Sequence, residues 1–192
     1  MTQRVPLPED HAPPEAGACH RCSLSSQRTR VIWGEGKPCA PAVILLDNPG
    51  AREDAAGRTF LCPTRATLLA ALAAAGLANR DVYVTYVLKC RPRRRYERRD
   101  AWDACLPWLQ TQLHAGPPKV IAALGNNVLR ALIRDPKAEV RENRGRILSW
   151  SGYPLVVSYH PLAARRQPGL FPLLVSDLGE VRKIAARTPP RP

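Results

Sequence analysis

The sequence predicts an α/β fold in which a mainly parallel sheet is covered by helices on both faces. Short apolar or β-branched segments alternate along the chain with longer segments of helical character, the order that builds such a sheet. A length of 192 residues suits one domain, and a hydrophobic content of 45% is enough to bury a core. We expect an extended proline-rich arm at residues 1–17, one domain at 18–187 and a disordered tail at 188–192.

Strands are expected where short apolar or β-branched runs end at turn-forming residues. The first run ends at Asn48-Pro49-Gly50, and the last two flank Ser151-Gly152-Tyr153, which predicts a hairpin. Helices are expected where leucines repeat on one face or where Pro and Gly mark the two ends. The expected strands cover residues 43–46, 81–88, 120–124, 146–150 and 154–159. The expected helices cover residues 63–75, 99–115, the segment from Gly125 to about residue 133, and 172–186.

The charge balance predicts a polyanionic partner. The chain has 29 Lys and Arg residues against 16 Asp and Glu residues, a formal net charge of +13. A codon bias would explain why Arg outnumbers Lys, but it would not explain the excess over acidic residues. Nucleic acid explains that excess, because the Arg side chain binds phosphate through two parallel hydrogen bonds. Arginines crowd into residues 91–99, so a phosphate-binding groove is expected there, with Arg93, Arg94 and Arg95 as the DNA-binding candidates.

Membrane insertion and secretion are not expected. No apolar run approaches the roughly 18 residues that a membrane helix needs. The first 17 residues have no apolar signal region. An acidic membrane surface is the rival partner for the positive charge, but no basic amphipathic helix stands out. We therefore expect a cytoplasmic monomer.

Four of the six cysteines are spaced as ligands of one inorganic group. Cys19 and Cys22 are two residues apart, Cys90 ends a predicted strand, and Cys105 lies within the next helix. Four soft ligands fit zinc or an iron–sulfur cluster. Zinc ribbons usually repeat the close spacing in both pairs, so the wide second pair favours a cluster. Cys39 is expected to be a small buried apolar residue without a further role. For Cys62, such a role and a functional one are equally well supported.

Two polar turns at the ends of predicted strands form a second candidate site. The segment 47–54 follows the first strand, and Ser158-Tyr159-His160-Pro161 follows the last one. Ligands of parallel sheets bind at the carboxyl ends of strands, so both turns are expected to face one pocket. A carboxylate or amide can hold a water there, and a histidine can donate a hydrogen bond to a leaving group. These residues therefore favour hydrolysis.

Further short motifs join these in a fixed order along the chain. They are Cys19-x-x-Cys22, Pro49-Gly50-Ala51-x-Glu53-Asp54, Lys89-Cys90-Arg91-Pro92, Cys105, Val120-Ile121-x-x-Leu124-Gly125, Arg144-Gly145, Tyr159-His160-Pro161 with Arg165, and Asp177-Leu178. The ordered set resembles the uracil-DNA glycosylase superfamily, most closely its iron–sulfur families 4 and 5, over nearly the whole chain after the arm. The resemblance implies a three-layer α/β/α sandwich with a central four-stranded, mainly parallel sheet. It also implies an enzyme that flips a deaminated base out of DNA and hydrolyses its N-glycosidic bond during base excision repair.

The resemblance implies roles for single residues as well. Phe60 would stack on the extruded base, His160 would contact uracil O2 and stabilise its anion, and Arg165 would lie on a loop that presses into the DNA. Gly50 and Glu53 are candidates for base binding, although Glu53 and its neighbour Asp54 are equally well explained as caps of the following segment. The ligands of one mainly structural [4Fe-4S] cluster would be Cys19, Cys22, Cys90 and Cys105.

The chain departs from the family 4 pattern at two places that bear on chemistry. Asp47 and Asn48 stand where that family has Glu and Ala in its Gly-Glu-Ala-Pro-Gly motif. Asn48 instead matches the turn of the mismatch-specific glycosylases, whose Asn holds the attacking water. The catalytic candidates are therefore Asn48, Asp47 and His160. Tyr86 stands where family 4 has the Asn that reads the uracil edge, so it is a candidate for base binding, or else a core residue of its strand.

Three other functions stay open. The same fold can have shifted specificity for xanthine, hypoxanthine or a base in a mismatch. It can be a DNA-binding relative without activity, which the changes at Asp47 and Tyr86 favour and the presence of Asn48 and His160 disfavours. It can be a redox sensor built on the cluster, for which no specific feature argues.

Overall fold

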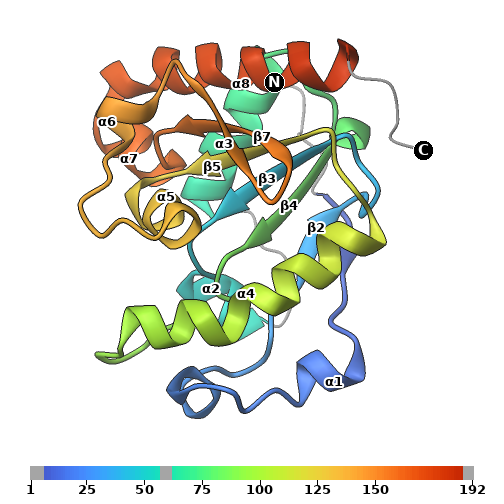
Figure 1. The fold of residues 1–192 in the computed structure, drawn as a ribbon, viewed down its shortest axis with the longest axis vertical. Helices are drawn as coiled ribbons and strands as arrows, with labels where there is room; N and C mark the ends of the chain where they lie inside the picture. Colours follow the sequence, from blue (N-terminus) through green and yellow to red (C-terminus); the bar gives the residue numbers. More distant parts are fainter. Residues whose placement is uncertain (1–6, 57–61, 188–192) are drawn as a thin grey trace.

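A seven-stranded sheet forms the centre of the computed structural model, which describes residues 7–56 and 62–187 (Figure 1). The strand order is β1-β2-β4-β3-β5-β7-β6. Neighbouring strands from β4 through β3 and β5 to β7 are parallel, while β1, β2 and β6 extend the sheet with antiparallel pairs. The strands are β1 Glu9–Asp10, β2 Gly34–Gly36, β3 Ala42–Leu46, β4 Val82–Tyr86, β5 Val120–Leu124, β6 Ile147–Trp150 and β7 Tyr153–Ser158.

The expectation of four strands is correct for the parallel centre and wrong for the whole sheet. The hairpin of β6 and β7 was expected from its pattern, but β1 and β2 are glycine-rich or acidic and show no apolar alternation. Tertiary contacts hold them instead. Tyr83 of β4 donates a hydrogen bond to Asp10 at 2.6 Å, and a side chain at Gly34 would collide with the Tyr83 ring.

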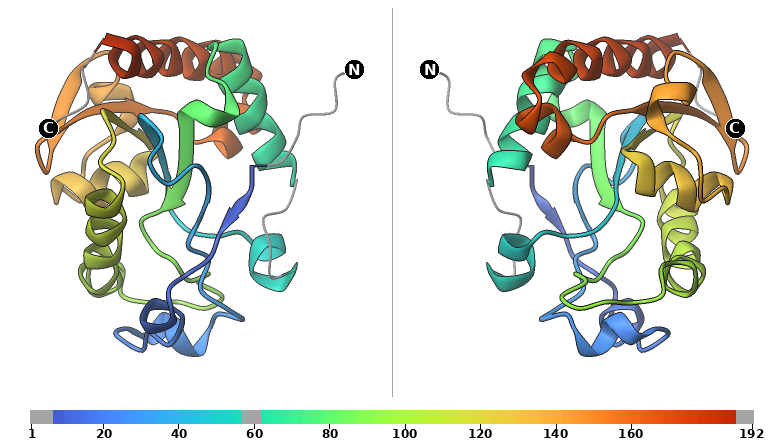
Figure 2. Two further views of the ribbon diagram at one scale, coloured as in Figure 1. Left: turned by 90° about the vertical axis from the view of Figure 1, so that its right-hand side faces the viewer. Right: turned by 90° about the vertical axis from the view of Figure 1, so that its left-hand side faces the viewer.

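Helices cover both faces of the sheet, so the three-layer expectation is confirmed (Figures 1 and 2). α4 and α5 pack on one face, and α3, α7 and α8 pack on the other. β3, β4 and β5 are buried along their whole length, as parallel strands between two helix layers must be. The α-helices are α1 Pro14–Gly17, α2 Ala51–Ala56, α3 Pro63–Ala74, α4 Arg98–Ala115, α5 Asn126–Ile133, α6 Val140–Asn143, α7 Pro161–Arg166 and α8 Phe171–Arg187. Single 3₁₀ turns are η1 Ser23–Ser26, η2 Asn79–Asp81 and η3 Pro168–Leu170.

The described part of the expected arm is joined to the domain. β1 pairs with β2, Leu7 is 2% exposed, and Glu9 forms an ion pair with Arg30. Residues 7–17 therefore include a strand and a helical turn, where the sequence predicted only extended chain. Within residues 7–56 and 62–187, no helix is both long enough and apolar enough to span a membrane.

Candidate functional site

A pocket of about 790 Å³ lies at the carboxyl ends of the central strands, where the sequence placed it. Its walls come from the segments that follow β3, β5 and β7, from the end of β4 and from the start of α3. Six predicted site residues line it: Asp47, Asn48, Gly50, Glu53, Tyr86 and His160. Phe60 lies outside the described residues. The fold thus brings the two predicted turns, more than 100 residues apart in the sequence, to one cavity.

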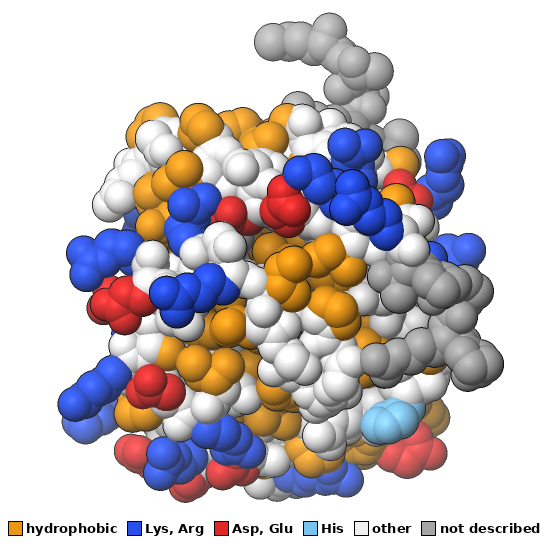
Figure 3. All heavy atoms as spheres, turned by 45° about the horizontal axis from the view of Figure 1, so that its top comes forward, with side chains coloured by type: hydrophobic (Ala, Val, Ile, Leu, Met, Phe, Trp, Pro, Cys, Tyr) orange, Lys and Arg blue, Asp and Glu red, His pale blue; other side chains and the backbone are white. Residues whose placement is uncertain are grey.

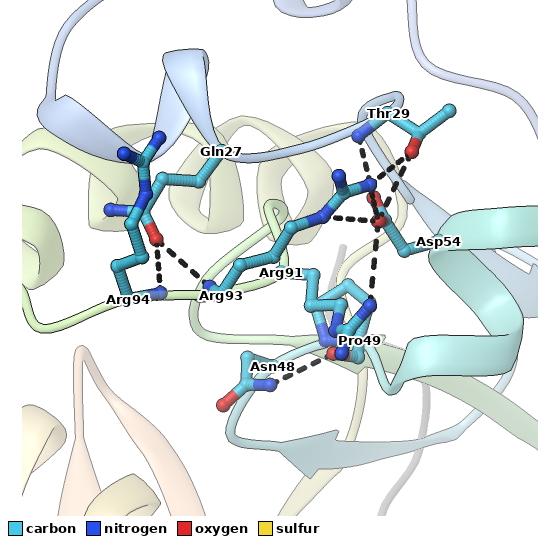
Figure 4. A network of polar contacts seen from close by, with 8 residues as sticks. All are labelled: Gln27, Thr29, Asn48, Pro49, Asp54, Arg91, Arg93 and Arg94. Atoms are coloured by element: carbon cyan, nitrogen blue, oxygen red, sulfur yellow. Dashed lines mark hydrogen bonds and ion pairs between the residues drawn. The ribbon is translucent and has the colours of Figure 1, made fainter.

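The side chain of Asn48 is fixed by its own turn. Its Nδ2 donates a hydrogen bond to the backbone oxygen of Pro49 at 2.8 Å (Figure 4). The amide nitrogen is therefore committed to the turn, and the oxygen Oδ1 remains as the acceptor on a pocket-lining side chain. An oriented acceptor of this kind can hold a water molecule without taking its proton.

Asp47, which precedes Asn48, is anchored by Asn127, a residue that the sequence analysis did not single out. Asn127, at the start of α5, donates a hydrogen bond to Asp47 Oδ2 at 2.7 Å. The other oxygen, Oδ1, is buried and has no hydrogen-bond partner among the described residues. Burial raises the pKa of Asp47, although the bond from Asn127 and the charge of Arg98 partly oppose this. Asp47 is thus a stronger base than an exposed carboxylate.

His160 caps α7 and is held as a neutral imidazole. Its Nδ1 accepts a hydrogen bond from the backbone N–H of Leu162 at 3.1 Å. Burial and the nearby charge of Arg65 lower the pKa of His160 to about 4. A neutral ring that accepts at Nδ1 carries its hydrogen on Nε2. The pocket therefore contains a histidine whose free nitrogen is a donor at neutral pH.

A buried network anchors the end of β7, two residues before His160. Ser158, at the end of β7, donates to Asp177 Oδ2 at 2.6 Å, and Arg144 donates to Asp177 Oδ1 at 2.9 Å. Gly125 has a φ of 105°, and a side chain there would come within 3.1 Å of His160 Cβ. Glycine is needed at this position both for the left-handed backbone and for the close approach of the histidine.

Glu53 belongs to the pocket, while its neighbour Asp54 does not. Glu53 lines the cavity, and the Cys62 thiol lies 3.5 Å from its Oε1. A side chain at Gly50 would come within 2.5 Å of Glu53 Oε2, so the predicted pair Gly50 and Glu53 approach closely. Cys62 caps α3 by accepting from the Arg65 backbone N–H.

Asp54 joins three segments through one fully buried carboxylate (Figure 4). It accepts hydrogen bonds from the Thr29 backbone at 2.8 Å and from Arg93 Nη2 at 2.5 Å, and Arg91 lies 3.9 Å away. Gln27 accepts from the backbone N–H groups of Arg93 and Arg94. The guanidinium of Arg93 is thus engaged by Asp54, and the predicted contact of Arg93 with DNA stays a prediction.

Replacing Asp54 with Asn should lower the free energy of unfolding by about 2 kcal/mol at pH 7, discounted for the partial exposure of Arg93. Burial alone would raise the pKa of Asp54, but the bonds from Arg93 and Thr29 outweigh it and lower the pKa. Its stabilising contribution is thus present above the unfolded pKa near 4 and is lost as the pH falls through the lower folded value. Urea unfolding of wild type and Asp54→Asn at pH 7 and pH 3 measures both effects. Equal stabilities at pH 7 would contradict the role of this network.

A strongly basic hollow of about 700 Å³ adjoins the pocket. Two arginines, Arg98 and Arg130, line both cavities. The predicted ligands Arg94 and Arg95 are exposed and belong to the hollow. Arg165 is exposed on α7 and does not line the hollow. On the face shown in Figure 3, by contrast, basic side chains are spread out and mixed with acidic ones.

The four predicted ligand cysteines surround one small cavity beside α1 and α4. Three N–H groups point at their sulfurs: Trp108 Nε1 lies 3.4 Å from Cys19, the Lys89 backbone nitrogen 3.3 Å from Cys105, and Arg28 3.6 Å from Cys90. Such donors suit thiolate sulfurs. Among the described residues, no three His, Cys, Asp or Glu side chains converge closely enough to hold a single metal ion.

The structure corrects the expected burial of Cys39 and places Cys62 in the pocket. Cys39 was expected to be buried and is exposed, because it sits in the turn between β2 and β3. Cys62, left open, is a half-buried pocket residue. His20, between two of the ligand candidates, is exposed.

The sequence analysis missed three residues that shape the site. Asn127 follows β5, so the strand-end argument applied to that strand would have found it. Arg65 lies on an amphipathic helix, where a charged residue indicates exposure, and no local signal shows that it is 5% exposed. Its buried ion-pair partner Glu35 lies on β2, a strand without a sequence signature.

Comparisons with known proteins agree with this geometry. The family model of the uracil DNA glycosylase superfamily matches residues 33–178. A type-4 uracil-DNA glycosylase of Pyrobaculum aerophilum is 34% identical over 163 residues, which cover 79% of this chain and 82% of that protein. A type-4 uracil-DNA glycosylase of Sulfurisphaera tokodaii is 31% identical over 186 residues, covering 92% and 84%. A type-5 uracil-DNA glycosylase of Pyrobaculum aerophilum is 30% identical over 112 residues, covering 58% and 49%. The chain therefore belongs to the uracil-DNA glycosylase superfamily.

Proposed function

We propose that this protein is a monofunctional DNA glycosylase that flips a deaminated base, uracil above all, out of DNA and hydrolyses its N-glycosidic bond in base excision repair. The observation that carries the proposal is that neutral His160, with its hydrogen on Nε2, lines the same cavity as the fixed acceptor Asn48. The names of the type-4 relatives support uracil as the base.

The reaction needs a donor for the leaving base and an acceptor for the attacking water. The bond between C1′ and the base nitrogen breaks with its electron pair on the base, and His160 Nε2–H stabilises the resulting anion. Asn48 Oδ1 orients the water that attacks C1′. Asp47 Oδ1, unpartnered among the described residues, accepts the proton that this water loses.

A panel of oligonucleotides, each with one modified base, tests the proposal directly. Incubation followed by alkaline cleavage of abasic sites should reveal cleavage of the uracil substrate, in single or double strands. Salt-sensitive DNA binding without release of any base would instead indicate a non-catalytic relative.

We further propose that Cys19, Cys22, Cys90 and Cys105 bind one [4Fe-4S] cluster. The donor set fits: four sulfurs share a cavity with three N–H donors, from the guanidinium of Arg28, the backbone of Lys89 and the indole of Trp108. The spacing along the chain favours a cluster over zinc, because Cys90 and Cys105 are 15 residues apart whereas zinc ribbons usually repeat the close spacing in both pairs. The cluster would be structural, and no step of the hydrolysis is assigned to it. We propose a cytoplasmic location, which is consistent with six cysteines that all lie in the described chain and form no disulfide. We also propose that the protein acts as a monomer.

Cys90→Ser should remove the iron and destabilise the fold, because Cys90 is a buried ligand candidate. Cys39→Ser is the matched control and should retain about four irons per chain, since Cys39 is exposed and does not line the cavity. Iron analysis and the visible absorption band of anaerobically purified protein measure this. Stoichiometric zinc without iron in the wild type would overturn the cluster.

Replacing Arg94 and Arg95 together with Ala should flatten the dependence of DNA affinity on salt. Each lost phosphate contact reduces the slope of log K against log[salt] by roughly 0.7–0.9. Arg93→Ala is the matched control from the same loop and should leave the slope unchanged, because Asp54 already engages its guanidinium. Fluorescence anisotropy at several salt concentrations gives both slopes. An Arg93 effect as large as that of Arg94 and Arg95 would show that the Asp54 contact opens on DNA.

A further inference from the structure

A buried arginine and a buried tyrosine form one wall of the pocket. Arg65 lies in the first turn of α3 and is 5% exposed, and Tyr86 ends β4 and is 2% exposed. Both line the cavity that also contains Asn48 and His160. Arg65 Nη2 donates a hydrogen bond to Tyr86 Oη at 2.7 Å and forms an ion pair with buried Glu35.

This wall presents hydrogen-bond donors from Arg65 and Tyr86, and the acceptors beside them are the carboxylates of Glu35 and Glu53. Arg65 Nε and Nη1 are buried and have no hydrogen-bond partner among the described residues. Tyr86 Oη already accepts from Arg65 and keeps its own hydrogen as a donor. A buried donor without a partner is unfavourable, and a ligand oxygen placed against it removes that penalty.

Deamination is the reaction that turns a donor on a base edge into an acceptor. It replaces the exocyclic amine of cytosine, adenine or guanine with the carbonyl of uracil, hypoxanthine or xanthine. A carbonyl satisfies the free donors of Arg65 and Tyr86, whereas an amine opposes them. An asparagine would offer one donor and one acceptor and so would also read the ring N–H beside the carbonyl. Donors alone recognise the carbonyl of a base and do not depend on the ring N–H beside it.

We propose that Arg65, together with Tyr86, determines base specificity by selecting bases that present a carbonyl oxygen to this wall, so that the pocket accepts oxopurines as well as uracil. The inference rests on the proposed glycosylase function and names its substrate class. Arg65 binds the base in this assignment, and Glu35 holds Arg65 without touching the substrate.

Tyr86→Phe tests the wall with the smallest possible change. It removes one hydroxyl and should slow single-turnover cleavage of uracil and hypoxanthine by roughly tenfold, the equivalent of one net hydrogen bond. Tyr83→Phe is the matched control, because Tyr83 is on the same strand, is equally buried and bonds to Asp10 and Gln112 outside the pocket. Equal effects of the two variants would overturn a role for the Tyr86 hydroxyl in base choice.

The double variant Arg65→Met with Glu35→Gln tests Arg65 without leaving a buried charge unpaired. Cleavage of uracil, hypoxanthine and xanthine should fall on the order of a hundredfold, as expected when a donor to a substrate carbonyl is lost. Affinity for undamaged DNA should not change. Glu35→Gln alone leaves the buried charge of Arg65 unpaired, so it is the control for lost stability, and it should keep the wild-type order of base preference. A double variant that keeps this order and the wild-type rates would overturn the inference.

Binding of free bases separates this inference from the proposed function. If wild type releases no base from any oligonucleotide, the glycosylase proposal fails. In that case, NMR titrations of wild type and the double variant with free uracil and with free cytosine test base recognition independently of catalysis. Preferential binding of uracil that is lost in the double variant supports it. Equal binding of the two bases by wild type overturns it.

Discussion

Replacing His160 with Ala should slow single-turnover cleavage of a uracil-containing oligonucleotide by on the order of 10²–10³. The imidazole is fixed by the Leu162 N–H at Nδ1 and keeps its hydrogen on Nε2, so it is a preorganised donor to the charge that develops on the departing base. DNA affinity should change little, because binding comes mostly from phosphate contacts. Rapid-mixing cleavage assays and anisotropy measure the two quantities on one preparation.

His114→Ala is the matched control for this result. His114 is exposed on α4 and contacts only its own helix, at the Gln110 carbonyl, among the hydrogen bonds of the described chain. It should cleave at the wild-type rate. A His160→Ala enzyme that is as fast as this control would show that another group stabilises the leaving base.

The pH dependence gives a second test of the same assignment. Because the pKa of His160 is lowered to about 4, the rate should show no step from His160 between pH 8 and pH 5 and should change only as the pH approaches 4. The unfolded histidine has a pKa near 6.5, so between these values the unfolded chain binds more protons and stability falls as the pH falls. His160→Ala should lack this part of the acid destabilisation. Asp47, whose pKa is raised, can produce a step of its own; a rate step near pH 6.5 that persists in Asp47→Asn would mean that the ring is not held neutral.

The parallel centre of the fold and most of the pocket could be predicted because both follow from local patterns. Apolar runs mark β3 and β5, and the turns at Asn48 and His160 lie where strands of a parallel sheet must end. Tyr86 shows the limit of such reasoning. The sequence offered a core residue or a base contact, and the structure places it in both settings at once, 2% exposed and lining the pocket.

The parts that could not be predicted depend on contacts between distant segments. The Arg65–Glu35 pair joins α3 to an edge strand made of Gly34-Glu35-Gly36, and neither residue carries a pattern that indicates burial. Arg93 looks like its neighbours Arg94 and Arg95 in the sequence. Only the position of Asp54, 39 residues earlier, separates it from them.

Asn48→Ala should slow single-turnover cleavage by on the order of 10²–10³, comparable to His160→Ala, because it removes the acceptor that orients the attacking water. The matched control is Asn143→Ala. Asn143 also donates from Nδ2 to a backbone carbonyl at 2.8 Å, that of Glu139, but it lies on α6 outside the pocket lining. It should leave the rate unchanged.

Asn48→Asp separates the two ends of the amide. Aspartate keeps an oxygen that can hold the water and loses the nitrogen that bonds to the Pro49 carbonyl. If the oxygen carries the function, this variant should stay within roughly tenfold of wild type while Asn48→Ala is slow, since only one net hydrogen bond in the turn is lost. If both variants are equally slow, the essential contact is the bond from Nδ2 that shapes the turn, and water positioning passes to Asp47. Asp47→Asn then distinguishes the roles, because an amide at that position can still orient a water through its oxygen but cannot accept its proton.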